Sequence, residues 1–230
     1  MIRDNIAADF IPTSAVPPDF RIRPAPPATY RWIGKRCFDI ALVVMGLPLT
    51  IPFILILAAV VMRDGGNPFF GHPRIGRDGR PFRCWKIRTM RRDAEARLRD
   101  LLASDAEVRS EWDASFKLKN DPRVTRVGRF LRRSSLDELP QIWNILKGEM
   151  SVVGPRPVTE VELDRYGFHR TTYMALRPGL TGLWQVSGRN DVSYDQRVEM
   201  DARYGDSCGF RLDLMIVART VLAVCGRTGR

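Results

Sequence analysis

IALVVMGLPLTIPFILILAAVVM, residues 40–62, is a run of 23 residues without a charged side chain. As an α-helix, which rises about 1.5 Å per residue, it would be about 34 Å long, enough to cross the ~30 Å hydrocarbon core of a bilayer. Pro48 and Pro52 lie inside the run. Each lacks a backbone donor and clashes with the carbonyl four residues before it. The run therefore predicts a membrane helix with a bend in its middle.

Basic residues flank this run on both sides. Three precede it between residues 31 and 36, and nine lie between residues 63 and 92 against two acidic ones. Because basic flanks tend to remain in the cytoplasm, both ends are expected on the same side of the membrane. A straight span does not allow this, whereas a helix that enters, breaks near Pro52 and returns does. We predict a re-entrant helix over residues 31–63, with a single span as the alternative.

Outside the membrane segment, the sequence predicts one N-terminal tail and one folded domain. Six of the sixteen prolines fall within residues 1–30, which predicts an extended, poorly ordered tail. Residues 64–230 are expected to form one cytoplasmic domain. The net charge of +11 suits anionic partners such as phospholipid headgroups, nucleic acid or a phosphorylated substrate. The four cysteines are scattered, with no C-x-x-C pair, which argues against a zinc site or a disulfide framework.

The predicted fold class is α/β, mainly helical. Turn signals at 65–68 and 77–81 surround short apolar runs and predict a hairpin. Residues 91–117 predict one or two amphipathic helices, and residues 139–150 predict a helix with an apolar face. Residues 154–191 are rich in proline and glycine, and much of this region is expected to be loop. The apolar pattern at 212–224 predicts a helix that lies in the membrane interface or packs on the core.

Asp137 and Glu138 form the strongest candidate for chemistry, although the local sequence favours a structural interpretation. Ser135-x-x-Glu138 fits a capping box, and Asp137 itself would serve as an N-cap with Pro140 at the third helical position. Adjacent helical side chains face different ways, however, so one carboxylate could meet a substrate and the other a metal. Arg132 would supply counter-charge for a phosphate. Beside a membrane segment, this combination suits phosphoryl transfer.

Basic residues elsewhere offer phosphate sites. Lys86 and Arg88 would share one face of a strand, as a phosphate site or as solvated charge, and the local sequence favours solvation. Arg156 and Arg177 each lie in a proline-stiffened stretch that limits how far the guanidinium must be ordered to meet a phosphate; an ordinary surface loop is the alternative.

Seven motifs occur in the order found in a known family. They are KRCFD at 35–39, RIG at 74–76, KIRTM at 86–90, SLDELPQ at 135–141, MSVVGPRP at 150–157, RPGLTG at 177–182 and QVSGRN at 185–190. Over residues 31–226 the chain thereby resembles the bacterial sugar transferases, the monotopic phosphoglycosyl transferases. Many members have Ser-Pro at the helix bend, whereas Ile51-Pro52 stands here, so the proline is kept but a hydroxyl that could satisfy a freed carbonyl is absent.

This resemblance implies a re-entrant membrane helix and a small cytoplasmic α/β catalytic domain with interfacial helices at the bacterial inner membrane. It implies a Mg²⁺-dependent, two-step transfer of a sugar phosphate from a UDP-sugar to a polyprenyl phosphate, with release of UMP. Asp137 would be the nucleophile, Glu138 the second carboxylate, and both would be metal ligands. Residues expected to bind substrate or phosphate are Lys86, Arg88, Arg132, Arg156, Arg177, Gln185 and Arg189.

Within the family, the stretch GRNDVSY at 188–194 resembles the branch that initiates exopolysaccharides with galactose-1-phosphate, and glucose is the alternative sugar. Expected partners are the UDP-sugar, undecaprenyl phosphate and inner-membrane lipids; a homodimer stays open. Two other classes compete with this reading. A basic nucleic-acid-binding protein conflicts with the 23-residue apolar run, so no nucleic acid is expected. A non-catalytic membrane scaffold would be insensitive to replacement of Asp137.

Overall fold

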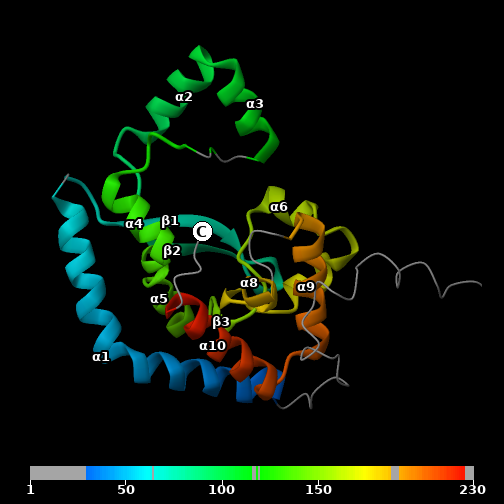
Figure 1. Ribbon diagram of the computed structural model, residues 1–230. Coiled ribbons are helices and arrows are strands. Elements are labelled where there is room, and N and C mark those ends of the chain that lie inside the picture. Colours follow the sequence, from blue (N-terminus) through cyan, green and yellow to red (C-terminus); the bar gives the residue numbers. More distant parts are fainter. Residues whose placement is uncertain (1–29, 64, 116–117, 119, 188–191, 226–230) are drawn as a thin grey trace, which may run out of the picture.

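A computed structural model describes residues 30–63, 65–115, 118, 120–187 and 192–225 (Figure 1). Within these residues a long first helix is followed by a mostly helical body with two small sheets, in agreement with the predicted fold class. The helices are α1 (Lys35–Met62), α2 (Ala94–Ser104), α3 (Ala106–Ser115), α4 (Arg126–Ser134), α5 (Gln141–Lys147), α6 (Glu160–Asp164), α7 (Arg170–Met174), α8 (Leu183–Ser187), α9 (Tyr194–Ser207) and α10 (Phe210–Cys225). Short π or 3-10 turns are η3 (Tyr30–Gly34), η4 (Arg77–Gly79), η5 (Leu136–Glu138) and η6 (Gly167–His169).

The two sheets have two strands each. β1 (Phe69–Ile75) and β2 (Pro81–Ile87) form the predicted hairpin, antiparallel, with His72 opposite Cys84. β3 (Ser151–Val153) and β4 (Gly179–Thr181) pair in parallel, with Ser151 opposite Gly179. A Cβ atom on Gly154 or Gly179 would collide with the backbone of the other segment. These motif glycines therefore allow the close approach of the two segments.

Helix α1 bends sharply near its middle, and its two halves run in different directions (Figure 1). By length and composition it is the one helix in the described residues able to cross a membrane. Its first half buries Lys35, Asp39 and Val43, and its second half buries Ile54, Ala58 and Val61. Each set is spaced three or four residues apart, so each half turns one narrow stripe toward the body. Many of the large apolar side chains between and around these stripes are exposed. Exposed apolar surface of this size marks a contact with another protein or with a membrane.

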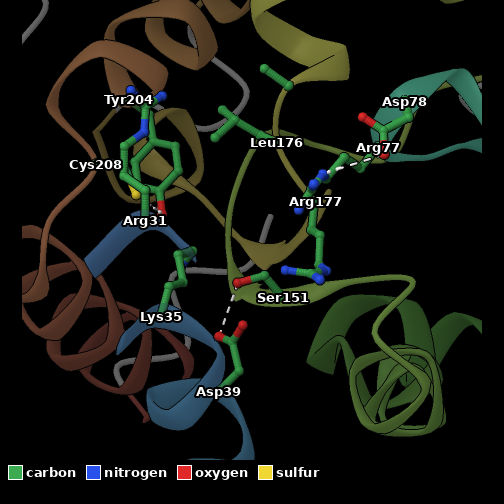
Figure 2. Close-up of a pocket in the computed structure, with 11 residues that line it drawn as sticks. Arg31, Lys35, Asp39, Arg77, Asp78, Ser151, Leu176, Arg177, Tyr204 and Cys208 are labelled. Carbon is green, nitrogen blue, oxygen red and sulfur yellow. Dashed lines mark hydrogen bonds and ion pairs between the residues drawn. The ribbon is translucent and has the colours of Figure 1, made fainter. Parts of the chain in front are cut away.

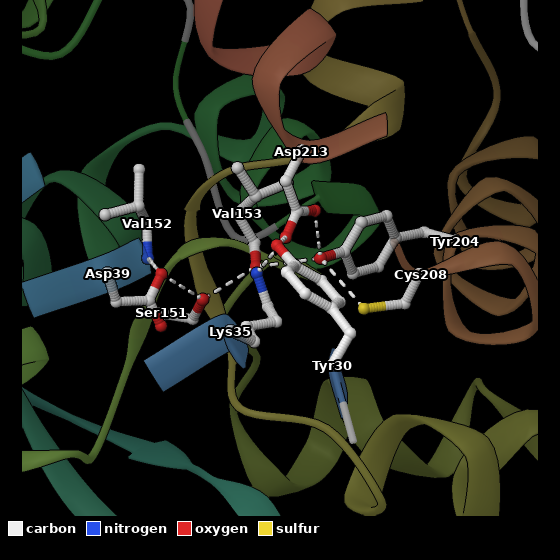
Figure 3. A network of polar contacts seen from close by, with 9 residues as sticks. All are labelled: Tyr30, Lys35, Asp39, Ser151, Val152, Val153, Tyr204, Cys208 and Asp213. Carbon is white, nitrogen blue, oxygen red and sulfur yellow. Dashed lines mark hydrogen bonds and ion pairs between the residues drawn. The ribbon is translucent and has the colours of Figure 1, made fainter. Parts of the chain in front are cut away.

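The start of α1 is fixed to the body by buried polar contacts (Figure 3). The Lys35 ammonium group donates to Asp213 Oδ2 at 2.7 Å, and the hydroxyls of Tyr30 and Tyr204 donate to the same carboxylate at 2.6 and 2.7 Å. Asp39 accepts hydrogen bonds from the Ser151 hydroxyl at 2.9 Å and from the Val152 N–H at 3.0 Å. These contacts join α1 to β3, α9 and α10.

The end of α1 reaches the same body. Val61 packs in one apolar cluster with Ile87 and Leu131, and Leu57 and Leu136 lie against it. The Arg88 guanidinium donates to the backbone carbonyls of Val61 at 3.2 Å and Gly65 at 2.7 Å. Both ends of a bent apolar helix are therefore attached to one domain.

Several predictions can be compared with these elements. Where one or two amphipathic helices were predicted, two form, α2 and α3, and they project from the body as a hairpin (Figure 1). The predicted loops occur within 154–187, but the short helices α6, α7 and α8, of five residues each, form between them. Helix α10 buries Asp213 and Ile216 but exposes Leu214 and Leu222, so it packs on the core and still presents an apolar face. The predicted tail lies outside the described residues apart from Tyr30.

Candidate active site

Asp137 lies in a tight turn between two helices. Helix α4 ends at Ser135, which has the left-handed φ of 56° that non-glycine residues rarely adopt. The chain then forms η5, and α5 begins at Gln141 with Pro140 as its N-cap. Neither Ser135 nor Asp137 makes a capping hydrogen bond at these turns. The capping interpretation is therefore wrong, because the left-handed residue redirects the chain before a helix can start.

The Asp137 carboxyl group is buried, with 7% of the residue exposed. Burial raises its pKa to about 6, and the neighbouring charge of Glu138 adds to this rise, whereas the charges of Lys86 and Arg132 oppose it. Among the described residues, no other residue donates a hydrogen bond to this carboxylate. A desolvated carboxylate that lacks donors keeps its oxygen lone pairs available for an electrophile.

Glu138 is held differently. Lys86 Nζ lies 2.5 Å from Glu138 Oε1, so strand β2 and turn η5 are joined by a half-buried ion pair. Arg132, in the last turn of α4, donates from Nε to the Thr89 hydroxyl at 2.9 Å. The structure thus brings four predicted residues together: Asp137, Glu138, Lys86 and Arg132.

The carboxylate pair suits one kind of metal site. No group of three or more His, Cys, Asp or Glu side chains within the described residues could enclose a metal ion. Mg²⁺ usually binds through one or two carboxylates and completes its shell with water and substrate phosphates. Asp137 and Glu138 therefore fit a Mg²⁺ ion that arrives with a diphosphate substrate.

The other predicted site residues lie elsewhere. Arg88 bonds to backbone carbonyls at the end of α1, which is a structural contact. The Arg156 side chain lies against Trp184, and Gln185 donates to the Leu180 carbonyl at 3.4 Å. Arg189 lies outside the described residues. The phosphate-binding roles of these residues remain predictions.

Arg177 lines a cavity of about 420 Å³ that Asp137 and Glu138 do not reach. Figure 2 shows Arg177 and Arg77 at one side of this cavity and Lys35 and Asp39 at another. Burial lowers the pKa of Arg177, and the nearby charges of Arg77 and Arg36 lower it further. The cavity lies at the start of α1 and is a basic pocket separate from the Asp137 turn.

The residues that attach the start of α1 to the body could not be identified from the sequence pattern. The motif at 35–39 gave no role for Lys35, Arg36 or Asp39, yet all three anchor α1 to the body. Arg36 donates to the carbonyls of Ile145 at 2.5 Å and Leu146 at 2.8 Å, at the end of α5. Its long-range partners lie more than 100 residues away, which no local pattern reveals.

Thr50 supplies a hydroxyl next to Ile51, the position where many members of the resembling family have serine. Its Oγ1 donates to the Gly46 carbonyl at 3.0 Å, between the two prolines of α1. A threonine one position earlier than the usual serine therefore provides a side-chain donor inside the bent segment.

Comparison with known proteins extends this picture. Residues 30–227 match the family model described as bacterial sugar transferase. The chain is 50% identical over 195 residues to the UDP-galactose-lipid carrier transferase of Erwinia amylovora, covering 85% of this chain and 41% of that protein. It is 49% identical over 195 residues to the undecaprenyl-phosphate galactose phosphotransferase of Salmonella typhimurium, covering 85% of this chain and 41% of that protein.

A third relative has a similar length. The exopolysaccharide production protein ExoY of Rhizobium meliloti is 50% identical over 194 residues, covering 84% of this chain and 86% of that protein. The chain therefore spans about two fifths of the length of the first two relatives but most of the third. The matching region includes both anchors of α1 and the Asp137 turn. The chain belongs to the bacterial sugar transferase family.

Proposed function

We propose that this protein transfers galactose-1-phosphate from UDP-galactose to undecaprenyl phosphate at the cytoplasmic face of the bacterial inner membrane. The reaction would initiate an exopolysaccharide repeat unit. The observation that supports it best is the buried Asp137 carboxylate, on which the charges of Lys86 and Arg132 act. UDP-glucose is the alternative donor for the same chemistry.

The reaction proceeds in two displacements at one phosphorus atom. An Asp137 oxygen attacks the β-phosphorus of the UDP-sugar, and the bond from that phosphorus to the bridging oxygen breaks. UMP leaves with the bridging oxygen and its electron pair, and the sugar phosphate remains on the carboxylate as an acyl phosphate. A phosphate oxygen of undecaprenyl phosphate then attacks the same phosphorus and displaces the Asp137 carboxylate.

Charges around Asp137 make the first displacement feasible. A carboxylate approaches a diphosphate only if the negative charges are compensated. Lys86 and Arg132 act electrostatically on Asp137, and Lys86 is oriented by its contact with Glu138. Asp137 and Glu138 would also hold Mg²⁺, which supplies Lewis-acid stabilisation of phosphate charge when bound.

The position of the turn suits a lipid acceptor. Leu136, directly before Asp137, packs against the cluster that contains Val61 near the end of α1. Both ends of α1 attach to one body, which supports the re-entrant form over a straight span. A re-entrant α1 would place Asp137 near the membrane surface, where the phosphate of a polyprenyl lipid lies.

The assignment of the sugar rests on the relatives. Two of those described above are named for galactose. Initial rates of UMP release should be compared with UDP-galactose, UDP-glucose and UDP-N-acetylglucosamine, in membranes supplied with undecaprenyl phosphate. The fastest release is expected with UDP-galactose; equal or faster release with UDP-glucose would transfer the assignment to glucose.

The covalent step has its own test. UDP-galactose and Mg²⁺ without lipid acceptor should leave a hexose phosphate on the peptide that contains Asp137, detectable as a mass increase. Hydroxylamine should remove it, because an acyl phosphate is electrophilic at its carbonyl carbon. Glu138→Gln should impair turnover while leaving the protein folded. A folded Asp137→Asn variant with normal UMP release would refute the assignment of the nucleophile.

A further inference from the structure

Two arginines lie over one buried tryptophan where α8 and α9 meet. The guanidinium carbon of Arg197, on α9, is 4.8 Å from the centre of the Trp184 ring, and that of Arg156 is 5.7 Å away. Trp184 is 5% exposed. Both distances suit a cation–π contact. One aromatic ring therefore holds two positive charges close together.

In the part of the chain that the structure describes, neither guanidinium group forms an ion pair with a carboxylate, although the Asp201 carboxylate lies close enough for the charge of Arg156 to act on it. The carboxylates nearby have other partners: Glu162 pairs with Arg74 at 2.8 Å, and Glu199 pairs with Arg203 at 3.1 Å. Partial burial lowers the pKa of Arg197, and the like charge of Arg156 lowers it further. The arrangement costs free energy unless an anion joins it.

Unpartnered polar atoms lie on α8 and α9, the two helices that meet at this ring. Trp184 Nε1, Ser187 Oγ, Arg197 Nε and Asp201 Oδ1 are buried without a hydrogen-bond partner in the described structure. The other oxygen of Asp201 accepts from the Tyr166 hydroxyl at 2.9 Å and from the Arg156 N–H at 3.4 Å. Buried polar atoms usually have partners, so the three possible donors, Trp184 Nε1, Ser187 Oγ and Arg197 Nε, point to an absent acceptor. The Asp201 oxygen is itself an acceptor and is not part of this argument.

One residue of this cluster, Arg156, and one of the two carboxylates, Glu138, act electrostatically on the same thiol. Burial raises the pKa of the Cys84 thiol in β2 to about 11, and the charges of Lys86, Glu138 and Arg156 also act on it. Arg156 is thus within electrostatic range of the strand that positions Lys86.

The proposed reaction requires two phosphate positions. The β-phosphate must reach Asp137, whereas the α-phosphate stays with the nucleoside and leaves as UMP. We propose that Arg197, together with Arg156, binds the α-phosphate of the UDP-sugar against Trp184 and stabilises the departing UMP. This inference rests on the proposed function and adds Arg197, a residue outside every motif of the sequence.

Steady-state kinetics of the full chain in membranes test the role of Arg197. Arg197→Gln should raise the KM for UDP-galactose by at least about 10-fold, because hydrogen bonds to charged groups typically contribute that much to binding. Arg197→Lys should recover part of the loss. Arg203→Gln is the matched control, since Arg203 lies on the same helix but pairs with Glu199; its KM should stay within about 2-fold of wild type.

A binding measurement separates this inference from the proposed reaction. By titration calorimetry, Arg197→Gln should weaken UMP binding about 10-fold and leave uridine binding unchanged, because uridine lacks the phosphate. Wild-type protein that binds UMP in this Arg197-dependent way but releases none from UDP-sugars would refute the reaction and retain the site. Unchanged UMP affinity in a folded Arg197→Gln variant, or no UMP binding by wild type, would overturn the inference.

Discussion

The ammonium group of Lys86 lies 2.5 Å from a carboxylate oxygen of Glu138, while Asp137 beside it receives no such ion pair. Adjacent carboxylates in one turn are therefore held in different environments. Glu138 is fixed to strand β2, and Asp137 is buried with its pKa raised to about 6. Such separation of two carboxylates by environment is typical of sites where one group reacts and the other orients charge.

Replacing Asp137 should stabilise the fold. The folded protein binds the Asp137 proton more tightly than the unfolded chain, so this contribution favours folding at low pH and is lost as pH rises from about 4 to about 6. At pH 7 the ionised group costs the folded state up to about 3 kcal/mol. Asp137→Asn removes that charge, and we expect the Tm in detergent to rise by several degrees while UMP release is lost. An unchanged or lower Tm would contradict the desolvation argument.

The pH profile of the reaction should show this ionisation. Only the deprotonated carboxylate is a nucleophile, so kcat/KM for UMP release should fall below about pH 6, the raised pKa of Asp137. The charge of Lys86 lowers that pKa. Lys86→Met should therefore shift the acidic limb to higher pH. Arg97→Gln, which removes an exposed cation paired with Asp93, is the control and should leave the limb in place. An acidic limb that Lys86→Met does not move would argue against Asp137 as the titrating group.

Local patterns predicted much of the fold but misjudged the Asp137 turn. The apolar run, its prolines and the hairpin turns depend on residues close in sequence, and they appear as α1, β1 and β2. The capping box at Ser135 failed because a left-handed Ser135 ends α4 and starts a 3-10 turn instead. True capping boxes occur at Thr159 and Ser193, where an extended N-cap residue precedes the helix.

Other parts of the site depend on distant contacts. The local sequence favours a solvated Lys86, whereas in the structure Lys86 donates to Glu138, which lies 52 residues away in the sequence. Arg197 belongs to no motif, and its position over Trp184 arises only when α8 and α9 pack together. Such pairings follow from tertiary packing, which neither periodicity nor motif order encodes.

The topology of α1 can be tested with cysteines at its two ends. Cys37 is exposed near the start of the helix, and Arg63→Cys would place a reporter directly after its end. If α1 is re-entrant, a membrane-impermeant maleimide should label neither position in intact spheroplasts and both after permeabilisation. A straight span would expose one of the two from outside. A cysteine placed at exposed Arg80, in the body, is the control for cytoplasmic location.

The anchor at the start of α1 should dominate its stability. Lys35 and Asp213 form an ion pair at 2.7 Å with side chains 10% and 0% exposed. Lys35→Met would leave the Asp213 charge buried without its cation, which typically costs about 3–5 kcal/mol. The hydroxyls of Tyr30 and Tyr204 still donate to Asp213, so the loss should lie toward the lower end of this range. For a chain of this size we expect the Tm to fall by roughly 6–12 °C.

Adding Asp213→Asn to Lys35→Met should recover part of the loss, because the double variant no longer buries an unpaired charge. Arg97→Gln, at an exposed pair, should shift the Tm by no more than about 2 °C. If Lys35→Met proved as mild as Arg97→Gln, the buried pair would not be what fixes the first half of α1 to the body.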